Sequence, residues 1–486
     1  MQQSIGQQIA RNSIAGVIGQ ITLRFISFGY TIAIVRQLGD ENFGEYSTAL
    51  ALIGILTILA DLGMANYVVR EVAKDRNAIS KLFGNMIVLR LILGSAVFFI
   101  NILAGYILGY NSTIIFYIAL GSIGLFLYAL YGPLDAILQG LERIDLSVQL
   151  TIINQVIIIL IGSVLLWQGW GVVGVFIASY IATIIVTVIA WNKTTKLTKL
   201  SINIDKKQWY ALLLAGFPFA VTIFATMLSF KVDTVLLSLW RPSTEIGWYN
   251  AAYNLIFALI SLSASFIGAL VPSLSRHYQQ DVQAVQQFFL QTVKILWIIS
   301  LPISVGVTME SEKIVLLLYG SEYLNAARIL HILIWVLPIL NITALCGSIT
   351  TVLHLERATA RINLINALFN ITLNLLIIPH FGVIGAAITT VITEFVGFVQ
   401  YTWLLHDKIP IKNIISTFSN TIIPAGSMIL VLWLNHHLDI FLTIPLAAVT
   451  YLGITFLTGG LRIAEVQIIV NTIAQALRKR AVASTK

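Results

Sequence analysis

Arg24 is the side chain of this sequence whose position most needs a chemical explanation. It lies in the middle of an apolar run, far from both ends, where its guanidinium does not easily reach water. A guanidinium in apolar surroundings needs an anion, and its planar fork of N–H donors suits a phosphate group. We therefore expect Arg24 to bind an anionic substrate. The alternative is a structural ion pair with Asp61, Asp233 or Glu394.

Polar residues form stripes along several apolar runs, at spacings that place them on one face of a helix. Polar side chains in hydrocarbon are costly unless they face protein or water, so such stripes predict a wet central cavity that binds the substrate. Interhelical hydrogen bonding between packed helices is the alternative explanation. The candidate cavity residues are Gln20, Arg24, Ser27, Thr31, Thr222, Thr226, Ser229, Asn250, Asn254, Asn363, Asn366, Asn370 and Asn374.

The remaining charged residues of the apolar runs each have two candidate roles or an unassigned one. Arg90 and Lys294 are expected to line the cavity, with snorkelling to the membrane surface as the alternative. Asp233 and Glu394 are candidates for binding a proton or cation that couples transport, and a structural role is the alternative for Asp233. Lys231 lies two positions from Asp233, about 200° round a regular helix, so the two do not share a face of an undistorted helix.

The apolar runs that carry these residues indicate an all-α polytopic membrane protein. Only 10% of the 486 residues are charged and the mean hydropathy is +0.90, which exceeds what a soluble core buries. A spanning helix needs about 20 apolar residues. About 14 transmembrane helices are predicted, near residues 14–35, 47–66, 84–109, 113–133, 146–167, 172–191, 211–235, 247–272, 288–309, 326–353, 362–378, 383–404, 416–434 and 441–460.

Basic residues are distributed unevenly between the loops that join these spans. Most of the 29 Lys and Arg fall on one side, including residues 193–207 and the C-terminal tail. Because cytoplasmic loops are enriched in Lys and Arg, both termini are predicted to be cytoplasmic and the membrane to be the cell membrane. The net charge of +8 is then explained by the basic cytoplasmic loops, which can contact anionic membrane lipid. No nucleic-acid partner is expected.

Part of the sequence is repeated after about two hundred residues. The polar stretch RQLGDENFGEYSTAL at Arg36–Leu50 returns in degraded form as RPSTEIGWYNAAYNL at Arg241–Leu255. The alignment places Gly44 on Gly247. We expect both stretches to form tight hairpins on the outer side, where the two glycines supply a turn or a close approach of helices.

A second pair of segments keeps the same order. WGVVGVFIASYIATII at Trp170–Ile185 resembles FGVIGAAITTVITEFV at Phe381–Val396. The repeat predicts two pseudo-symmetric six-helix lobes, 1–205 and 206–405, with the substrate path between them. Residues 406–486 then hold two further spans and a basic tail.

Several chemistries have no motif in this sequence. It contains no GxxxxGK[ST] phosphate-binding loop, no HExxH and no CxxC, and its single cysteine is Cys346. The N-terminus is polar and lacks the pattern of a cleaved signal peptide. We expect no enzymatic activity, no cofactor and no metal.

The stretch RQLGDENFGEYSTA, followed by ADLGMANYVVREVA at Ala60–Ala73, resembles the start of prokaryotic polysaccharide transporters. These are the oligosaccharide flippase branch of the multidrug/oligosaccharidyl-lipid/polysaccharide exporter superfamily, whose fold is MATE-like. The resemblance implies a flippase that moves polyprenyl-pyrophosphate-linked oligosaccharide across the cytoplasmic membrane by alternating access. Arg24 matches a basic residue that lines the cavity in related flippases. Glycosyltransferases and a polysaccharide polymerase are the implied partners. A drug/cation antiporter and a non-transporting partner in glycan assembly are the alternatives.

Overall fold

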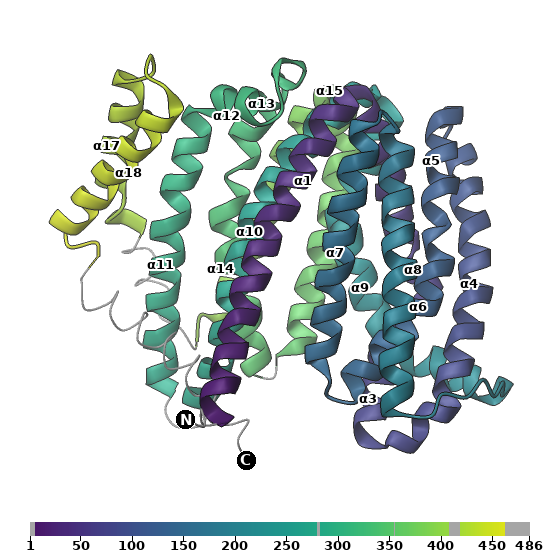
Figure 1. Ribbon diagram of the computed structural model, residues 1–486. Coiled ribbons are helices and arrows are strands. Elements are labelled where there is room, and N and C mark those ends of the chain that lie inside the picture. The colour runs from purple at the N-terminus through teal and green to yellow at the C-terminus, as the bar shows by residue number, and fades with distance from the viewer. Residues whose placement is uncertain (1–4, 279–281, 354, 408–417, 462–486) are drawn as a thin grey trace. The chain divides into compact units, whose positions relative to one another are not determined.

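The computed structural model of the protein describes residues 5–278, 282–353, 355–407 and 418–461 (Figure 1). Within these ranges all regular structure is helical and no strand occurs, as predicted. The helices divide into two compact units. The N-terminal unit is Phe25–Asn250 with Asn374–Gly382. The C-terminal unit comprises the described residues of Met1–Arg24, Ala251–Leu373 and Val383–Lys486.

The unit boundaries run through three helices and do not coincide with the lobes 1–205 and 206–405 that the repeat predicts. The lobe assignment therefore stays a prediction. In the N-terminal unit are the later part of α1 (Ile5–Leu56), α2 (Ile58–Asp61), α3 (Met64–Lys74), η1 (Arg76–Ala78), α4 (Ile79–Ile107), α5 (Ser112–Ser122), α6 (Gly124–Gly140), α7 (Ile144–Trp167), α8 (Gly171–Leu197), α9 (Lys206–Trp240) and the first residues of α10 (Ser243–Tyr278).

A buried apolar cluster holds one end of the N-terminal unit together. Met64, Val68 and Val72 recur every four residues, so they share one face of α3, and all three are fully buried. They pack with residues of α4 and α6, including Phe83 and Ile137. This packing fixes the position of the turn between α2 and α3, which follows Asp61, the last residue of α2.

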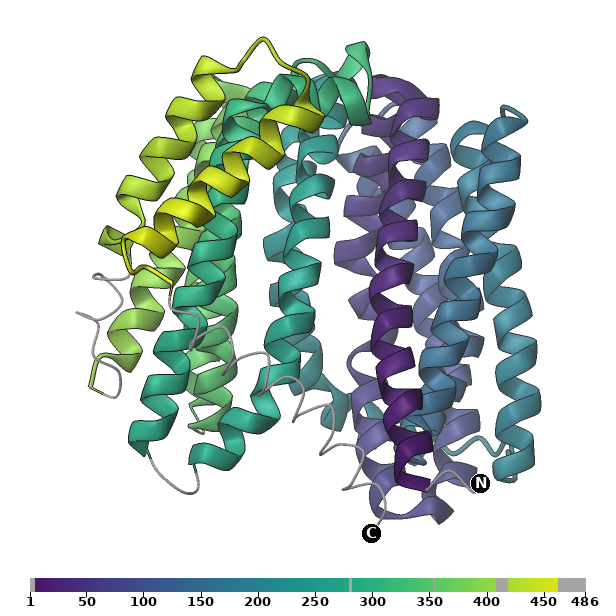
Figure 2. The ribbon, with the colours of Figure 1, turned by 60° about the vertical axis from the view of Figure 1, so that its left-hand side comes forward.

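The C-terminal unit contains most of α10 and the helices that follow it. These are α11 (Val282–Met309), α12 (Ser311–Leu318), η2 (Ser321–Tyr323), α13 (Ala326–Leu333), α14 (Val336–Val352), most of α15 (Glu356–Leu405), α17 (Ile422–Leu434) and α18 (Ile440–Leu457). Two apolar clusters join them, one between α11, α14 and α15 and the other between α11, α17 and α18. The last two helices lie side by side (Figure 2).

All fourteen predicted spans have helical counterparts in the described ranges. Ten helical segments are long and apolar enough to cross a membrane. Two of them hold two predicted spans each, because α1 kinks at Gly39 and α15 kinks at Gly382, both at positive φ. The other two predicted spans correspond to α10 and to the shorter apolar helix α17.

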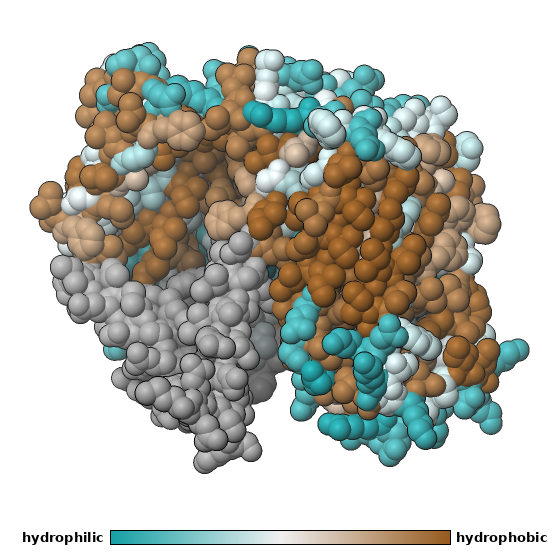
Figure 3. Space-filling model, in the orientation of Figure 1, coloured by the Kyte–Doolittle hydropathy of each residue, from teal (hydrophilic) through white to brown (hydrophobic). Residues whose placement is uncertain are grey.

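Large apolar side chains cover the flank formed by α7 and α8 (Figure 3). Leu160, Trp167 and Val188 are 63%, 82% and 56% exposed. Hydrophilic residues gather at the ends of these helices (Figure 3). An apolar surface of this extent, with hydrophilic residues gathered at the helix ends, is suited to a lipid bilayer and would be unfavourable in water. The protein is a multi-span membrane protein.

Candidate functional site

Arg24 is exposed, as are its neighbours Phe25 and Ile26. Its guanidinium donates a hydrogen bond to the backbone carbonyl of Ser261 in α10. Among the described residues Arg24 takes part in no ion pair with a carboxylate. A carbonyl carries only a partial charge, so it does not neutralise a guanidinium. The guanidinium therefore keeps its full charge and spare donors for an anion.

Asp61, one of the alternative partners of Arg24, is bound to Arg90 instead. The Arg90 Nε lies 2.9 Å from Asp61 Oδ1, and the guanidinium also sits over the ring of Tyr128, 5.4 Å from its centroid. Gly132 of α6 makes room for it, because a Cβ there would collide with the guanidinium. Arg90 is only 3% exposed. In this conformation Arg90 is a buried structural cation, and its contact with substrate stays a prediction that requires this ion pair to open.

Asp233 belongs to a second buried polar cluster. Its carboxylate accepts hydrogen bonds from the hydroxyl of Tyr249, at 3.0 Å, and from the side-chain amide of Asn374, at 2.7 Å. All three residues are at most 3% exposed. The donors come from α10 and α15, so the carboxylate ties three helices of the N-terminal unit together. Both of these donors are neutral groups, and a carboxylate buried in a membrane span is a candidate for binding a proton or a cation.

Three of the four asparagines in the predicted stripe of α15 bond to the second half of the same helix. Asn363 accepts from the Tyr401 hydroxyl at 3.2 Å, and Asn366 accepts from Gln400 at 2.8 Å. Asn370 donates to Thr393 at 3.4 Å. These contacts join the segments before and after the Gly382 kink into a hairpin. They agree with the interhelical hydrogen bonding that was the alternative to cavity lining, and substrate binding by this stripe stays a prediction.

The other predicted site residues lie on α1, α9, α10, α11 and α15. Thr31 and Ser229 donate to the carbonyls of Ser27 and Ala225, one turn earlier, which satisfies a hydroxyl within its own helix. Asn250 accepts from Thr234 at 3.2 Å. Thr226 is exposed, and Asn254, Lys294 and Glu394 are half-buried. The side chains of Gln20 and Thr222 lie outside the described residues.

The two glycines of the repeated stretch meet face to face within the N-terminal unit. A Cβ on Gly44 would collide with the carbonyl of Ser243, and a Cβ on Gly247 would collide with the carbonyl of Asp40. We call these four residues the glycine contact. It is reciprocal, because the alignment that places Gly44 on Gly247 also places Asp40 on Ser243. Equivalent positions of the two copies therefore bind each other, as in a two-fold interface. The turn itself is made by Gly39, at φ 71°.

Side-chain hydrogen bonds surround the glycine contact. The indole Nε1 of Trp248 donates to Asp40 at 2.9 Å, which joins one copy of the repeat to the other. The side-chain amide of Asn111, at the start of α5, donates to Glu45 of the first copy at 2.9 Å. Sequence analysis did not identify Trp248 or Asp40 as interacting residues. The alignment of the two copies could have pointed to them, because Asp40 lies within about one helical turn of Gly44 and Trp248 is next to Gly247.

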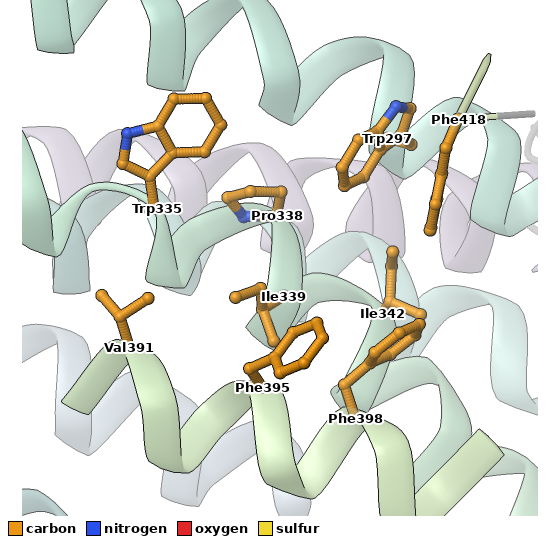
Figure 4. A pocket seen from close by; sticks show the side chains of 9 residues that line it. All are labelled: Trp297, Trp335, Pro338, Ile339, Ile342, Val391, Phe395, Phe398 and Phe418. Carbon is orange, nitrogen blue, oxygen red and sulfur yellow. The ribbon is translucent and has the colours of Figure 1, made fainter. Parts of the chain in front are cut away.

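An apolar cavity of about 410 Å³ lies between α11, α14 and α15 in the C-terminal unit (Figure 4). Phe395 and Phe398 of α15 point toward Ile339 and Ile342 of α14 across it. The indole nitrogen of Trp297 donates to Thr421, at 2.9 Å, so this polar atom is satisfied by a residue that does not line the cavity. The lining residues are Trp297, Trp335, Pro338, Ile339, Ile342, Val391, Phe395, Phe398 and Phe418. Their chemistry suits a hydrocarbon chain.

Comparison with known proteins identifies the family. Residues 9–278, more than half of the chain, match the family described as "Polysaccharide biosynthesis protein". The chain belongs to this family. Residues 218–376 also match the family described as "MatE". Both matches include the part of α9 from residue 218 on and the repeated stretch that leads into α10.

Among polysaccharide biosynthesis proteins, the chain is 23% identical over 472 residues to "Probable low-salt glycan biosynthesis flippase Agl15" of Haloferax volcanii. The match covers 93% of this chain and 97% of that relative. The fold is similar to the solved structure "Lipid II flippase MurJ, inward closed conformation", with a TM-score of 0.78 at 18% identity, over 91% of this chain and 98% of that one. An inward-facing multidrug resistance MATE family transporter matches with a TM-score of 0.63 at 14% identity, over 81% of this chain and 98% of that one. The MATE-like fold predicted from the sequence is confirmed.

Proposed function

We propose that this protein is a flippase that moves a polyprenyl-pyrophosphate-linked oligosaccharide across the cytoplasmic membrane for surface polysaccharide biosynthesis. Membership of the polysaccharide biosynthesis protein family and the full-length similarity to a protein named a glycan biosynthesis flippase support this. The observation that carries the proposal is Arg24, an exposed guanidinium in a membrane span without a carboxylate partner among the described residues. Transport of this kind requires no enzymatic step and no cofactor.

The substrate has two chemically different parts, and the protein offers a matching group for each. The pyrophosphate is the part that Arg24 would bind, through the planar fork of its guanidinium. The polyprenyl chain is the part that the apolar cavity of α11, α14 and α15 would accept. The four asparagines of α15 and the polar residues of α9 and α10 are candidates for contacting the sugars.

Alternating access requires a closure that separates in each cycle. The glycine contact is suited to this role, because it joins the two copies of the repeat by direct approach of their backbones. We infer that it closes the outer end of the path. The uneven distribution of Lys and Arg between the loops supports an orientation in which both termini and residues 193–207 face the cytoplasm.

Asp233 is the residue we favour for coupling transport to an ion. It is buried in a membrane-spanning helix and accepts hydrogen bonds from Tyr249 and Asn374, so a change in its protonation would be felt by α10 and α15. Glu394 is the second candidate. The substrate must come from reactions that build a sugar chain on a lipid pyrophosphate, so glycosyltransferases act before this protein and a polymerase or transferase acts after it.

Loss of the gene, followed by extraction of the lipid-linked glycans, tests the function. We expect lipid-linked oligosaccharide to accumulate in the inner leaflet, where it is inaccessible to a lectin added to intact cells. Re-expression of the intact chain should restore surface glycan, whereas Arg24→Ala should not. Normal surface glycan together with sensitivity to cationic drugs would instead identify a drug/cation antiporter.

A further inference from the structure

Lys231 is a second cation deep in a membrane span. It lies nine residues before the end of α9 at Trp240, which corresponds to about 14 Å along the helix axis. The hydrocarbon core of a bilayer is about 30 Å thick, so this position is near its middle. The four-carbon stem of a lysine does not bridge that distance to the membrane surface. Snorkelling therefore does not explain this residue.

Asp233, the nearest carboxylate in sequence, does not neutralise Lys231. The two residues point about 200° apart around α9. Asp233 accepts hydrogen bonds from Tyr249 and Asn374 on its two carboxylate oxygens. Within the described part of the chain, Lys231 makes no hydrogen bond and no ion pair. Its side chain is half-buried.

Gly54 of α1 lies beside the stem of Lys231. A Cβ on Gly54 would be 3.9 Å from the Lys231 Cγ, an ordinary contact distance, so a small residue borders the lysine here. The Cγ of the stem thus lies beside α1, while among the described residues the ammonium has no counter-charge. An uncompensated ammonium in hydrocarbon is expensive, and such residues normally face a ligand or water.

We propose that Lys231 is an anion-binding residue for the diphosphate of the substrate, additional to Arg24 and in the half of α9 that the predicted topology places toward the outer leaflet. The inference rests on the proposed flippase function. A lysine is a compact point charge without the guanidinium fork. It therefore holds a phosphate with less geometric demand than Arg24, which suits a position that the head group must leave again.

Binding measurements on the full chain in lipid nanodiscs test this. The probes are farnesyl diphosphate and uncharged farnesol, which share an isoprenoid chain and differ in the anion. Removing one charged hydrogen bond should weaken binding of the diphosphate about 10-fold or more in Lys231→Gln. Binding of farnesol should not change. Lys231→Arg should stay within about 3-fold of the unmodified chain, because the charge is kept.

Lys196→Gln is the matched control, since Lys196 is an exposed cation at the end of α8. It should leave diphosphate binding unchanged. If Lys231→Gln binds farnesyl diphosphate as tightly as the unmodified chain while Arg24→Ala does not, the inference about Lys231 is wrong and the proposed function stands. If the unmodified chain fails to distinguish farnesyl diphosphate from farnesol, the proposed function fails as well. Rescue of Lys231→Gln by Asp233→Asn would show a structural ion pair and overturn the inference.

A measurement on the unmodified chain avoids any folding defect of the variants. Farnesyl diphosphate should protect Lys231, and not Lys196, from a membrane-permeant amine-reactive reagent, as read by mass spectrometry of the peptides. Equal labelling of Lys231 with and without the diphosphate would contradict the inference.

Discussion

Substituting Gly247 by alanine is the sharpest perturbation of the glycine contact. The new methyl group would lie on the backbone of Asp40, 2.9 Å from its carbonyl carbon and 3.3 Å from its Cα, with the carbonyl oxygen closer still. Backbone cannot rotate away as a side chain does, so α1 and α10 must separate. Overpacking of this kind costs about 1–3 kcal/mol. The higher helix propensity of alanine acts on the closed and open states alike.

If that cost falls on the closed state alone, the ratio of open to closed molecules rises about 5- to 150-fold. Labelling of a buried reporter cysteine measures this ratio. Ser47 is suited as the reporter, because it lies one turn after Gly44, is 9% exposed and is close to cysteine in size. In cells that express the protein with Ser47→Cys, the added Gly247→Ala substitution should accelerate the reaction of the new cysteine with a membrane-impermeant maleimide by a factor in that range.

Gly426→Ala is the control for this experiment. Gly426 lies in α17, and a Cβ there meets no atom within 4 Å. It should leave the labelling rate of Ser47→Cys unchanged. An unchanged rate in well-expressed Gly247→Ala, or an equal acceleration in Gly426→Ala, would refute the role of the glycine contact as a closure.

Three further predictions concern the contact between the two copies of the repeat, Arg24 and the ion pair of Asp61 with Arg90. Cysteines in place of Asp40 and Trp248, which hydrogen-bond between the two copies of the repeat, should stop transport when they are oxidised and restore it when they are reduced. A disulfide in place of the Glu45–Asn111 hydrogen bond, both within residues 1–205, should not stop transport. Transport by the Asp40–Trp248 disulfide would show that the glycine contact does not open during transport. Measured by surface glycan, Arg24→Ala should abolish flipping although its abundance in the membrane stays normal. Arg24→Lys should keep part of the activity and Arg24→Glu should have none. Full transport by Arg24→Ala would contradict the proposed role of Arg24. Asp61→Asn should lower the free energy of unfolding by about 3 kcal/mol in thermal or denaturant unfolding, because it leaves the buried guanidinium of Arg90 unpaired. Glu71→Gln, at the exposed ion pair with Lys74, should lower it by less than about 1 kcal/mol. Equal losses in the two variants would contradict the structural role of Arg90.

The spans and their order could be predicted from the sequence because they depend on local composition. A run of apolar residues long enough to cross a bilayer has few other stable conformations, so each predicted span has a helical counterpart. The repeat was visible for a similar reason. Gly44 and Gly247 occupy equivalent positions in two related stretches, and their helices approach each other so closely that no side chain fits.

The partners of the charged and polar residues depended on the tertiary structure. Arg24 and Arg90 are both basic residues in apolar runs, yet only Arg90 meets Asp61, because α2, α4 and α6 are packed around it. The sequence placed the asparagines of α15 on one face, but only the Gly382 kink, which brings the two halves of that helix together, supplies their partners Gln400 and Tyr401. Helical periodicity tells which side chains share a face and is silent on what that face meets. Hydrogen bonds and ion pairs act over about 3–4 Å, so only the packing of helices distant in sequence decides which groups are neutralised and which remain for a substrate.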